Sequence, residues 1–222
     1  IDANVFRACV EAGVRKVISA SSVSVYPIDA QQKPGVVLSE DDLNYYNPEG
    51  GYGWAKLLGE IELGWIKGVD IAIARIFNVY GPCQPLDETA HVVPALARKA
   101  ITYPKEDFIV WGSGGQSRCF LYVSDCVEAL LRLEEEASNP PIIVNVGSDE
   151  EVLIRTIAEK IVKISGKSIE IKYDLTKPVG PASRTADIGR AKTLLEWRPI
   201  VGLDEGLRRT YTWAEKRLEI AR

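Results

Sequence analysis

The sequence predicts an α/β protein built on a doubly wound parallel sheet, and three observations indicate this fold class. Residues 3–12 carry apolar side chains at helical spacing and pass through Gly13 into a short apolar strand at 14–20, the pattern of half a βαβ unit. The segment 71–76 is almost continuously apolar, as in a parallel strand covered on both faces. Helical and strand-like segments then keep alternating. Because the chain begins in mid-motif, we expect a truncated sheet.

The other elements follow from local signals along the chain. Residues 27–50 are rich in Pro, Gln, Asp and Asn, which predicts a long loop, and a loop of this length in a compact domain is usually functional. Ser124 is expected to cap the helix that follows it. The predicted helices span 51–66, 92–101, 125–135, 152–164, 188–195 and 203–219, the predicted strands span 108–111, 118–123, 142–146 and 168–173, and residues 174–186 are predicted to be loop.

The composition is that of a globular protein: 222 residues, 46% hydrophobic and 26% charged, enough for one large domain or two small ones. The net charge of -4 includes no basic block, which argues against a nucleic-acid partner, and no apolar run reaches the ~18 residues of a membrane span. The four cysteines form no CxxC pair and His91 is the single histidine, so no metal site is expected. Reduced thiols are typical of a cytoplasmic protein, the localisation that we expect.

Tyr52 and Lys56 form the first chemical motif. Four residues apart in a segment of helical composition, they lie one turn apart on one face of a helix. An ammonium beside a phenol stabilises the phenolate, so the Tyr52 hydroxyl could exchange a proton with a hydroxyl or carbonyl group at neutral pH. The pair alone is a weak signal, because a Tyr packed beside a solvated Lys is the commoner reason for this spacing.

The topology of a doubly wound sheet strengthens the motif. Such a sheet places its ligands at the carboxyl ends of its strands. Ser21 and Ser22 end the strand at 14–20, Tyr52 and Lys56 lie on the next helix, and Asn78 follows the strand at 71–76. Together these groups predict an acid/base site for a carbinol or ketone, for which a hydride acceptor is the natural partner.

Longer motifs carry a family resemblance along essentially the whole chain. They are Ser-Ser-Val-Ser-Val-Tyr-Pro at 21–27, Tyr-Gly-Trp-Ala-Lys at 52–56, Ala-Arg-Ile-Phe-Asn-Val-Tyr-Gly-Pro at 74–82, Trp-Gly-Ser-Gly at 111–114, Arg-Cys-Phe-Leu-Tyr-Val-Ser-Asp at 118–125, Val-Asn-Val-Gly-Ser at 144–148, Arg-Thr-Ala-Asp at 184–187, Trp-Arg-Pro at 197–199 and Glu-Gly-Leu at 205–207. In this order they resemble the extended short-chain dehydrogenase/reductases, the family of NAD-dependent nucleotide-sugar epimerases and dehydratases with a Rossmann-type sheet.

The resemblance implies a role for each matched residue. Ser22, Tyr52 and Lys56 match the catalytic Ser, the acid/base and its partner. Tyr52, Lys56, Phe77 and Ser21 are expected to contact NAD, and Asn4 matches an Asn of the active-site network. Asn78, Arg118, Arg184 and Ser24 are expected to contact the nucleotide-sugar, with the two arginines on its diphosphate, for which a fork of donors is well suited.

The resemblance also implies a division of the chain. A partial NAD-binding Rossmann domain is expected at 1–81 and 120–147, and a smaller α/β nucleotide-sugar-binding region at 82–119 and 148–222. The family's GxxGxxG turn is absent from the sequence, and the Gly-rich run at 112–115 lies between two strands, so we reject it as a phosphate cradle. With Ile1 as first residue and no Met, the chain is interpreted as a fragment, a processed chain or an incomplete record. An open sheet edge invites pairing with another chain, and a homodimer is expected.

The reaction that we favour is C4 epimerisation of a UDP- or GDP-sugar. Dehydratases carry an Asp-Glu or Ser-Glu pair just past the catalytic hydroxyl, where this chain has Val23 and Ser24, so dehydration is disfavoured. The 3,5-epimerases carry Cys in place of Ser24 and Lys in place of Asp87. A 4-epimerase needs only Ser, Tyr, Lys and NAD. A decarboxylase or reductase of the same family, and a non-catalytic fragment that needs a partner chain, stay open as alternatives.

Overall fold

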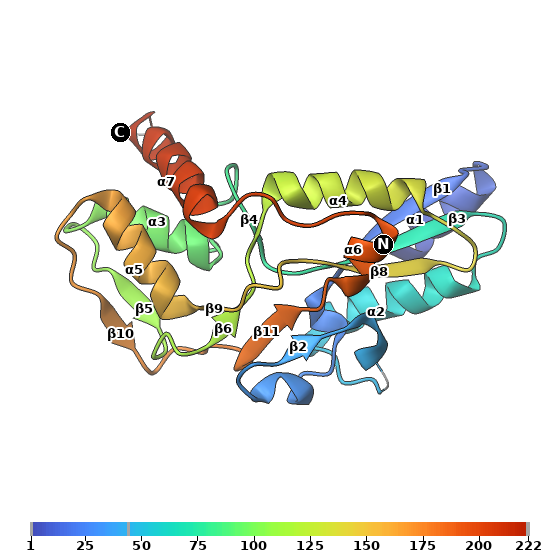
Figure 1. Ribbon diagram of the computed structural model, residues 1–222, viewed down its shortest axis with the longest axis horizontal. Helices are drawn as coiled ribbons and strands as arrows, with labels where there is room; N and C mark the ends of the chain where they lie inside the picture. Colours follow the sequence, from blue (N-terminus) through green and yellow to red (C-terminus); the bar gives the residue numbers. More distant parts are fainter. Residues whose placement is uncertain (1, 44, 221–222) are drawn as a thin grey trace.

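A three-stranded parallel sheet forms the centre of the computed structural model, which describes residues 2–43 and 45–220 (Figure 1). Strand β3 (Asp70–Ile76) lies between β1 (Lys16–Ser22) and β8 (Ile142–Val146). Along β1 and β3 the register runs from Lys16 opposite Asp70 to Ser22 opposite Ile76. The α/β fold with a parallel sheet is therefore confirmed, and Ser22 stands at the carboxyl end of its strand.

Helices cover both faces of this sheet. Helix α4 (Val123–Glu135) lies on one face and α2 (Gly50–Trp65) on the other, as Figure 1 shows. Helix α1 (Asp2–Glu11) packs on α2, and α6 (Gly189–Leu194) packs on β8. Double coverage explains why β3 is apolar along nearly its whole length.

A second sheet is built from much shorter strands. It joins β2, β11, β6 and β9 in that order, and only the β6–β9 pair is antiparallel. The bounds are Val37–Leu38 for β2, Ser183–Ala186 for β11, Ser117–Arg118 for β6 and Val152–Leu153 for β9. This sheet brings Arg118 and Arg184 to paired positions on neighbouring strands.

Most of the remaining elements form the end of the molecule that lies left of the second sheet in Figure 1. Helices α3, α5 and α7 pack on one another, and two further parallel strand pairs, β5 with β10 and β4 with β7, adjoin them. Helices α3, α5 and α7 span Val92–Thr102, Ile154–Ser165 and Leu203–Ile220. The strand bounds are Ile109–Trp111 for β5, Lys172–Asp174 for β10, Val79–Tyr80 for β4 and Leu121–Tyr122 for β7.

Three 3-10 helices lie between β1 and α2 in the chain. They span Val23–Val25, Asp29–Gln32 and Glu40–Asp42.

Two large hydrophobic clusters form the core. One cluster packs on both faces of the parallel sheet and includes Leu57, Ala74 and Val144. The other lies among α3, α5 and α7 and includes Phe108 and Ile157. Residues 186–197 pack into the first cluster although they follow the second sheet in the chain. The domain division therefore stays a prediction. Within the described residues, the helices lack the length and apolar character to cross a membrane.

Several predicted elements differ from the structure. The predicted strand at 118–123 is two strands, β6 and β7, because the chain leaves the second sheet after Arg118 and joins β4 at Leu121. Helix α4 begins at Val123 with Tyr122 as its N-cap, so the prediction that Ser124 caps it was wrong.

The segments predicted as loops contain short elements as well. Residues 174–186 include β11, and residues 27–50 include β2 and two 3-10 helices. The strand predicted at 168–173 starts only at Lys172. Elements of two to four residues are too short for hydrophobic periodicity to reveal, and here they are fixed by tertiary pairing.

Candidate active site

Ser22 occupies the junction between β1 and the first 3-10 helix. Its Oγ accepts a hydrogen bond from the backbone N–H of Ser24, 3.2 Å away, and so caps that helix. The neighbouring Ser21 hydroxyl is buried and donates to Glu60, which in turn pairs with Arg75 at 2.8 Å. The two serines thus differ: Ser21 belongs to a buried polar network, whereas Ser22 lies at the rim of the sheet.

Helix α2 carries Tyr52 and Lys56 to that same rim. Lys56 Nζ donates to the carbonyl of Ala20 on β1 at 2.9 Å and lies 5.9 Å from the centroid of the Tyr52 ring. The helix can pack closely on the 3-10 helix that follows β1 because residue 53 is Gly. A Cβ at Gly53 would stand 2.3 Å from the carbonyl oxygen of Ser24. The glycine after Tyr52 is therefore required by packing.

Asn78 marks the end of β3 and has a left-handed backbone with φ of 30°, unusual for a residue other than Gly. Its Nδ2 donates to the carbonyl of Cys119 at 3.0 Å, which holds the side chain beside the start of β7. Phe77 behaves differently, since its side chain is fully buried against Tyr26. A side-chain contact between Phe77 and a cofactor is therefore not supported, because the ring is part of the core.

Arg118 is held by backbone carbonyls. Its guanidinium donates to Ser117 O at 2.6 Å, to Pro181 O at 2.8 Å and to Val179 O at 3.2 Å. Burial, together with the nearby charge of Arg184, lowers the pKa of Arg118 to about 10. The group therefore keeps its positive charge at neutral pH, and it is fixed without a carboxylate partner among the described residues.

Arg184 is held by side chains instead. Its Nε donates to Gln31, which is fully buried and is itself fixed by the carbonyls of Tyr26 and Pro27. Its Nη2 donates to Glu49 Oε2 at 2.6 Å. Arg184 also lies close enough to Arg118 to depress that residue's pKa, so the two guanidinium groups form one positively charged feature suited to a diphosphate.

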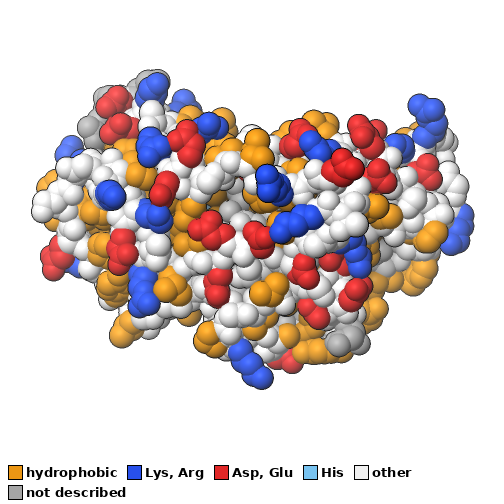
Figure 2. All heavy atoms as spheres, viewed as in Figure 1, with side chains coloured by type: hydrophobic (Ala, Val, Ile, Leu, Met, Phe, Trp, Pro, Cys, Tyr) orange, Lys and Arg blue, Asp and Glu red, His pale blue; other side chains and the backbone are white. Residues whose placement is uncertain are grey.

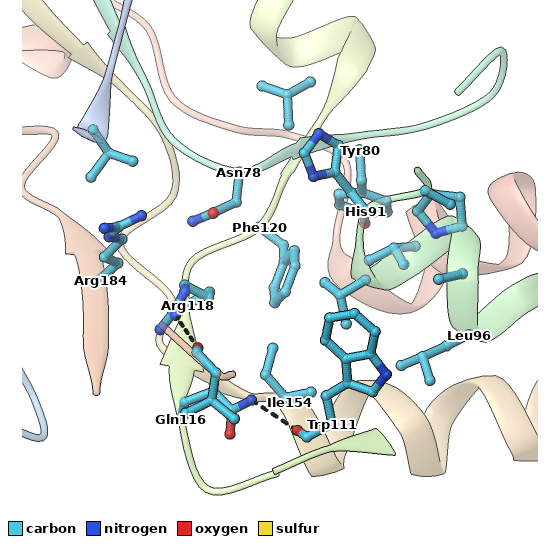
Figure 3. Close-up of a pocket in the computed structure, with 18 of the residues that line it drawn as sticks. Asn78, Tyr80, His91, Leu96, Trp111, Gln116, Arg118, Phe120, Ile154 and Arg184 are labelled. Carbon is cyan, nitrogen blue, oxygen red and sulfur yellow. Dashed lines mark hydrogen bonds between the residues drawn. The ribbon is translucent and has the colours of Figure 1, made fainter. Parts of the chain in front are cut away.

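These groups meet in one cleft of about 1150 Å³. Figure 3 shows Asn78, Arg118 and Arg184 on one side of it and Trp111 on the other, with Phe120 between them. Of the nine predicted site residues, eight line the cleft and Phe77 does not. The eight are Ser21, Ser22, Ser24, Tyr52, Lys56, Asn78, Arg118 and Arg184. Asn4 is also absent from the lining. It is exposed on α1 and accepts from Arg7, and its place in the active-site network stays a prediction.

Other cleft residues were missed from the sequence. His91, which precedes α3, points into the cleft near Tyr80 in Figure 3, and Asp87 lines it too. Trp111 and the apolar face of α3 form the wall of the cleft opposite Arg118 and Arg184, and Phe120 lies between the two walls. The helical periodicity of α3 marked its buried face, but nothing in the pattern indicated that part of that face borders a cavity.

The residues present fit the nicotinamide end of a dinucleotide. Tyr52 is 59% exposed beside the β1 rim, and Lys56 Nζ uses one of its three N–H donors on Ala20. A pyrophosphate cradle is not found in the described part of the chain. The Gly-rich run at 112–115 turns from β5 to β6 and opens no helix, as the sequence indicated.

Comparison with known proteins gives a consistent assignment. The model of the NAD dependent epimerase/dehydratase family matches residues 1–147. GDP-mannose 3,5-epimerase 1 from Oryza sativa subsp. indica is 35% identical over 212 residues, covering 93% of this chain and 55% of the relative. UDP-N-acetyl-alpha-D-glucosaminuronate decarboxylase from Bacillus cytotoxicus is 33% identical over 222 residues, covering 95% and 66%.

Solved structures agree. UDP-glucose 4-epimerase from Thermotoga maritima, crystallised with UDP-glucose, matches with a TM-score of 0.87 and 26% identity, covering 98% of this chain and 69% of that one. The chain spans about half to two thirds of the length of the curated relatives. It belongs to the NAD dependent epimerase/dehydratase family.

Proposed function

We propose that this chain, as a member of the NAD dependent epimerase/dehydratase family, supplies the acid/base and diphosphate-binding groups of a nucleotide-sugar 4-epimerase. One observation carries the proposal. Tyr52, Lys56 and Ser22 share a single cleft with Arg118 and Arg184, although they come from separate segments of the chain. Proton transfer and anion binding can therefore act on one substrate molecule.

The protein's own groups divide the work. In the oxidation step the Tyr52 phenolate takes the proton of the sugar hydroxyl and becomes the phenol, and in the reduction step the phenol returns that proton to the sugar oxygen; the Lys56 ammonium stabilises the phenolate. Ser22 Oγ donates or accepts at the same sugar oxygen. When NAD is bound beside Tyr52 and Lys56, it supplies a hydride acceptor and donor. Arg118 and Arg184 bind the diphosphate and keep the sugar in place.

The two residues after Ser22 favour epimerisation over dehydration. Elimination of water calls for a carboxylate directly after the catalytic Ser, and this chain has Val23 and Ser24 there. Decarboxylation is the second candidate, because a nucleotide-sugar decarboxylase is 33% identical over nearly the whole chain.

We also propose a homodimer and a cytoplasmic localisation. Within the described residues β1 pairs with β3 on one side only, so its other edge could pair with another chain. The four cysteines are free thiols, which a reducing cytoplasm maintains.

Product analysis tests the proposal. The protein that contains this chain is purified, scanned for nicotinamide absorbance, and incubated with NAD and a panel of UDP- and GDP-hexoses and UDP-hexuronic acids. We expect NMR to show inversion at C4 at constant mass. Release of CO2 would favour the decarboxylase, and a protein that binds no NAD and turns over no sugar would favour the non-catalytic alternative. Light scattering in the same buffer measures the dimer.

A further inference from the structure

Glu49 joins three parts of the cleft through one carboxylate. Its Oε2 accepts from Arg184 Nη2 at 2.6 Å and from Ser24 Oγ at 3.1 Å. The residue directly precedes α2, the helix that carries Tyr52. A single negative group therefore links the 3-10 helix after β1, the start of α2 and strand β11.

The backbone of Glu49 is fixed, whereas its side chain has room to move. Its N–H donates to Ser24 O at 2.9 Å, and its own carbonyl accepts from Gly53 N at 3.0 Å. Its side chain is 36% exposed, and that of Arg184 is 8% exposed. The carboxylate can therefore rotate toward solvent, while Gln31 retains Arg184 in place through its Nε.

We propose that Glu49 is an internal competitor for the substrate diphosphate: its carboxylate occupies Arg184 and yields that guanidinium when a nucleoside diphosphate binds. The inference rests on the proposed function, in which Arg184 binds the diphosphate. Glu49 is thus a residue that sets affinity and acts through Arg184, and it takes no part in the chemistry.

The charge balance of the cleft gives the direction of the effect. Glu49 neutralises Arg184, while Arg118 bonds only to carbonyls within the described residues. A diphosphate at Arg184 must displace this carboxylate or lie beside it, and either event opposes binding electrostatically. Removing the charge of Glu49 should therefore strengthen diphosphate binding and leave binding of an uncharged nucleoside unchanged.

The experiment is isothermal titration of Glu49→Gln with UDP and GDP. We expect the variant to bind whichever diphosphate the wild type binds about fivefold more tightly, since one partly exposed ion pair contributes up to about 1 kcal/mol. Binding of uridine or guanosine and cooperative thermal unfolding verify that the variant is folded. Glu88→Gln is the matched control: it removes a carboxylate that lines the cleft and has no bond to Arg184 in the described structure, and we expect less than a twofold change in affinity.

The direction of the change in diphosphate affinity decides the inference. Unchanged binding by Glu49→Gln overturns the inference, because the carboxylate would then not compete with the ligand. Weaker binding overturns it as well, because Glu49 would then orient Arg184 for the ligand. A wild-type protein that binds neither UDP nor GDP overturns the proposed function itself, and the inference with it.

Discussion

The two sheets hold their functional groups by different means. The parallel sheet places Ser22 at the end of a seven-residue strand, and Tyr52 and Lys56 lie on a sixteen-residue helix. The second sheet places Arg118 and Arg184 on strands of two and four residues. The groups that we propose for proton transfer therefore lie on long regular elements, and the groups that we propose for diphosphate binding lie on short ones.

The difference shows what each site needs for rigidity. A long helix positions its side chains through its own backbone hydrogen bonds, and a long strand does so through a ladder of bonds to its neighbours. A strand of two residues cannot, so Arg118 is tied to the carbonyls of Val179 and Pro181, and Glu151 bridges Ser117 on β6 to Ser183 on β11. Four substitutions test this contrast, beginning with the largest expected effect.

The buried pair of Glu60 and Arg75 should contribute most to stability. Both side chains are under 5% exposed, and Glu60 also accepts from Ser21. Glu60→Gln leaves the Arg75 charge buried without its counter-ion, and we expect a loss of about 3 kcal/mol in the free energy of unfolding. Urea denaturation measures it. The control is Glu205→Gln, which breaks exposed pairs with Arg208 and Arg209 on α7 and should lose less than about 1 kcal/mol. Equal losses would mean that burial of the Glu60–Arg75 pair does not determine how much it contributes to stability.

Tyr52→Phe should have the largest effect on turnover. The variant loses the proton-transfer hydroxyl but keeps the ring and the Lys56–Ala20 bond, so we expect turnover to fall ~10²-fold or more. Affinity for a nucleoside diphosphate should stay the same, because the arginines lie on the other sheet. Steady-state kinetics and titration separate the two quantities. Near-normal turnover would remove Tyr52 from the proposed mechanism.

The same contrast explains how far the sequence predicts the fold. The apolar run at 71–76 and the helical stripes identified β3, α2, α3 and α7 to within a residue or two, because long elements carry periodic patterns. The strands β2, β9 and β11 carry no recognisable pattern, since two to four residues hold at most two periods of strand alternation. Their positions depend on pairing partners that are distant in sequence.

The site follows a similar rule. Ser22, Tyr52 and Asn78 could be placed at one rim because the carboxyl ends of parallel strands coincide. The contacts of Arg184 with Gln31 and Glu49 could not be foreseen, because they join residues more than 130 positions apart through a loop. Phe77 shows that a matching motif does not by itself locate a side chain: the residue lies in the matched segment at 74–82, but its ring is buried in the core.

Arg118→Lys tests anchoring by carbonyls. A Lys has the charge but not the planar fork that reaches three carbonyls, so we expect KM for the nucleotide-sugar to rise about tenfold with kcat nearly unchanged. Arg132→Lys is the matched control, because Arg132 also donates to two carbonyls, those of Leu195 and Glu196, outside the cleft. It should lower the melting temperature slightly without changing KM. A similar KM in both variants would mean that Arg118 is only structural.

Glu151→Gln should give the smallest effect, and it should appear as a pH dependence. Hydrogen bonds from the hydroxyls of Ser117 and then Ser183 lower the pKa of Glu151 below its ordinary value of 4.5. A lowered carboxyl pKa stabilises the folded state above 4.5, and this contribution is lost as pH falls through the lower, folded-state pKa. The wild type should therefore exceed the variant in urea midpoint at neutral pH, and the two midpoints should converge in acid, below the folded-state pKa of Glu151. A difference that persists at low pH would mean that Glu151 links β6 to β11 as well when protonated, and that the charge of the bridge is not what holds the short strands together.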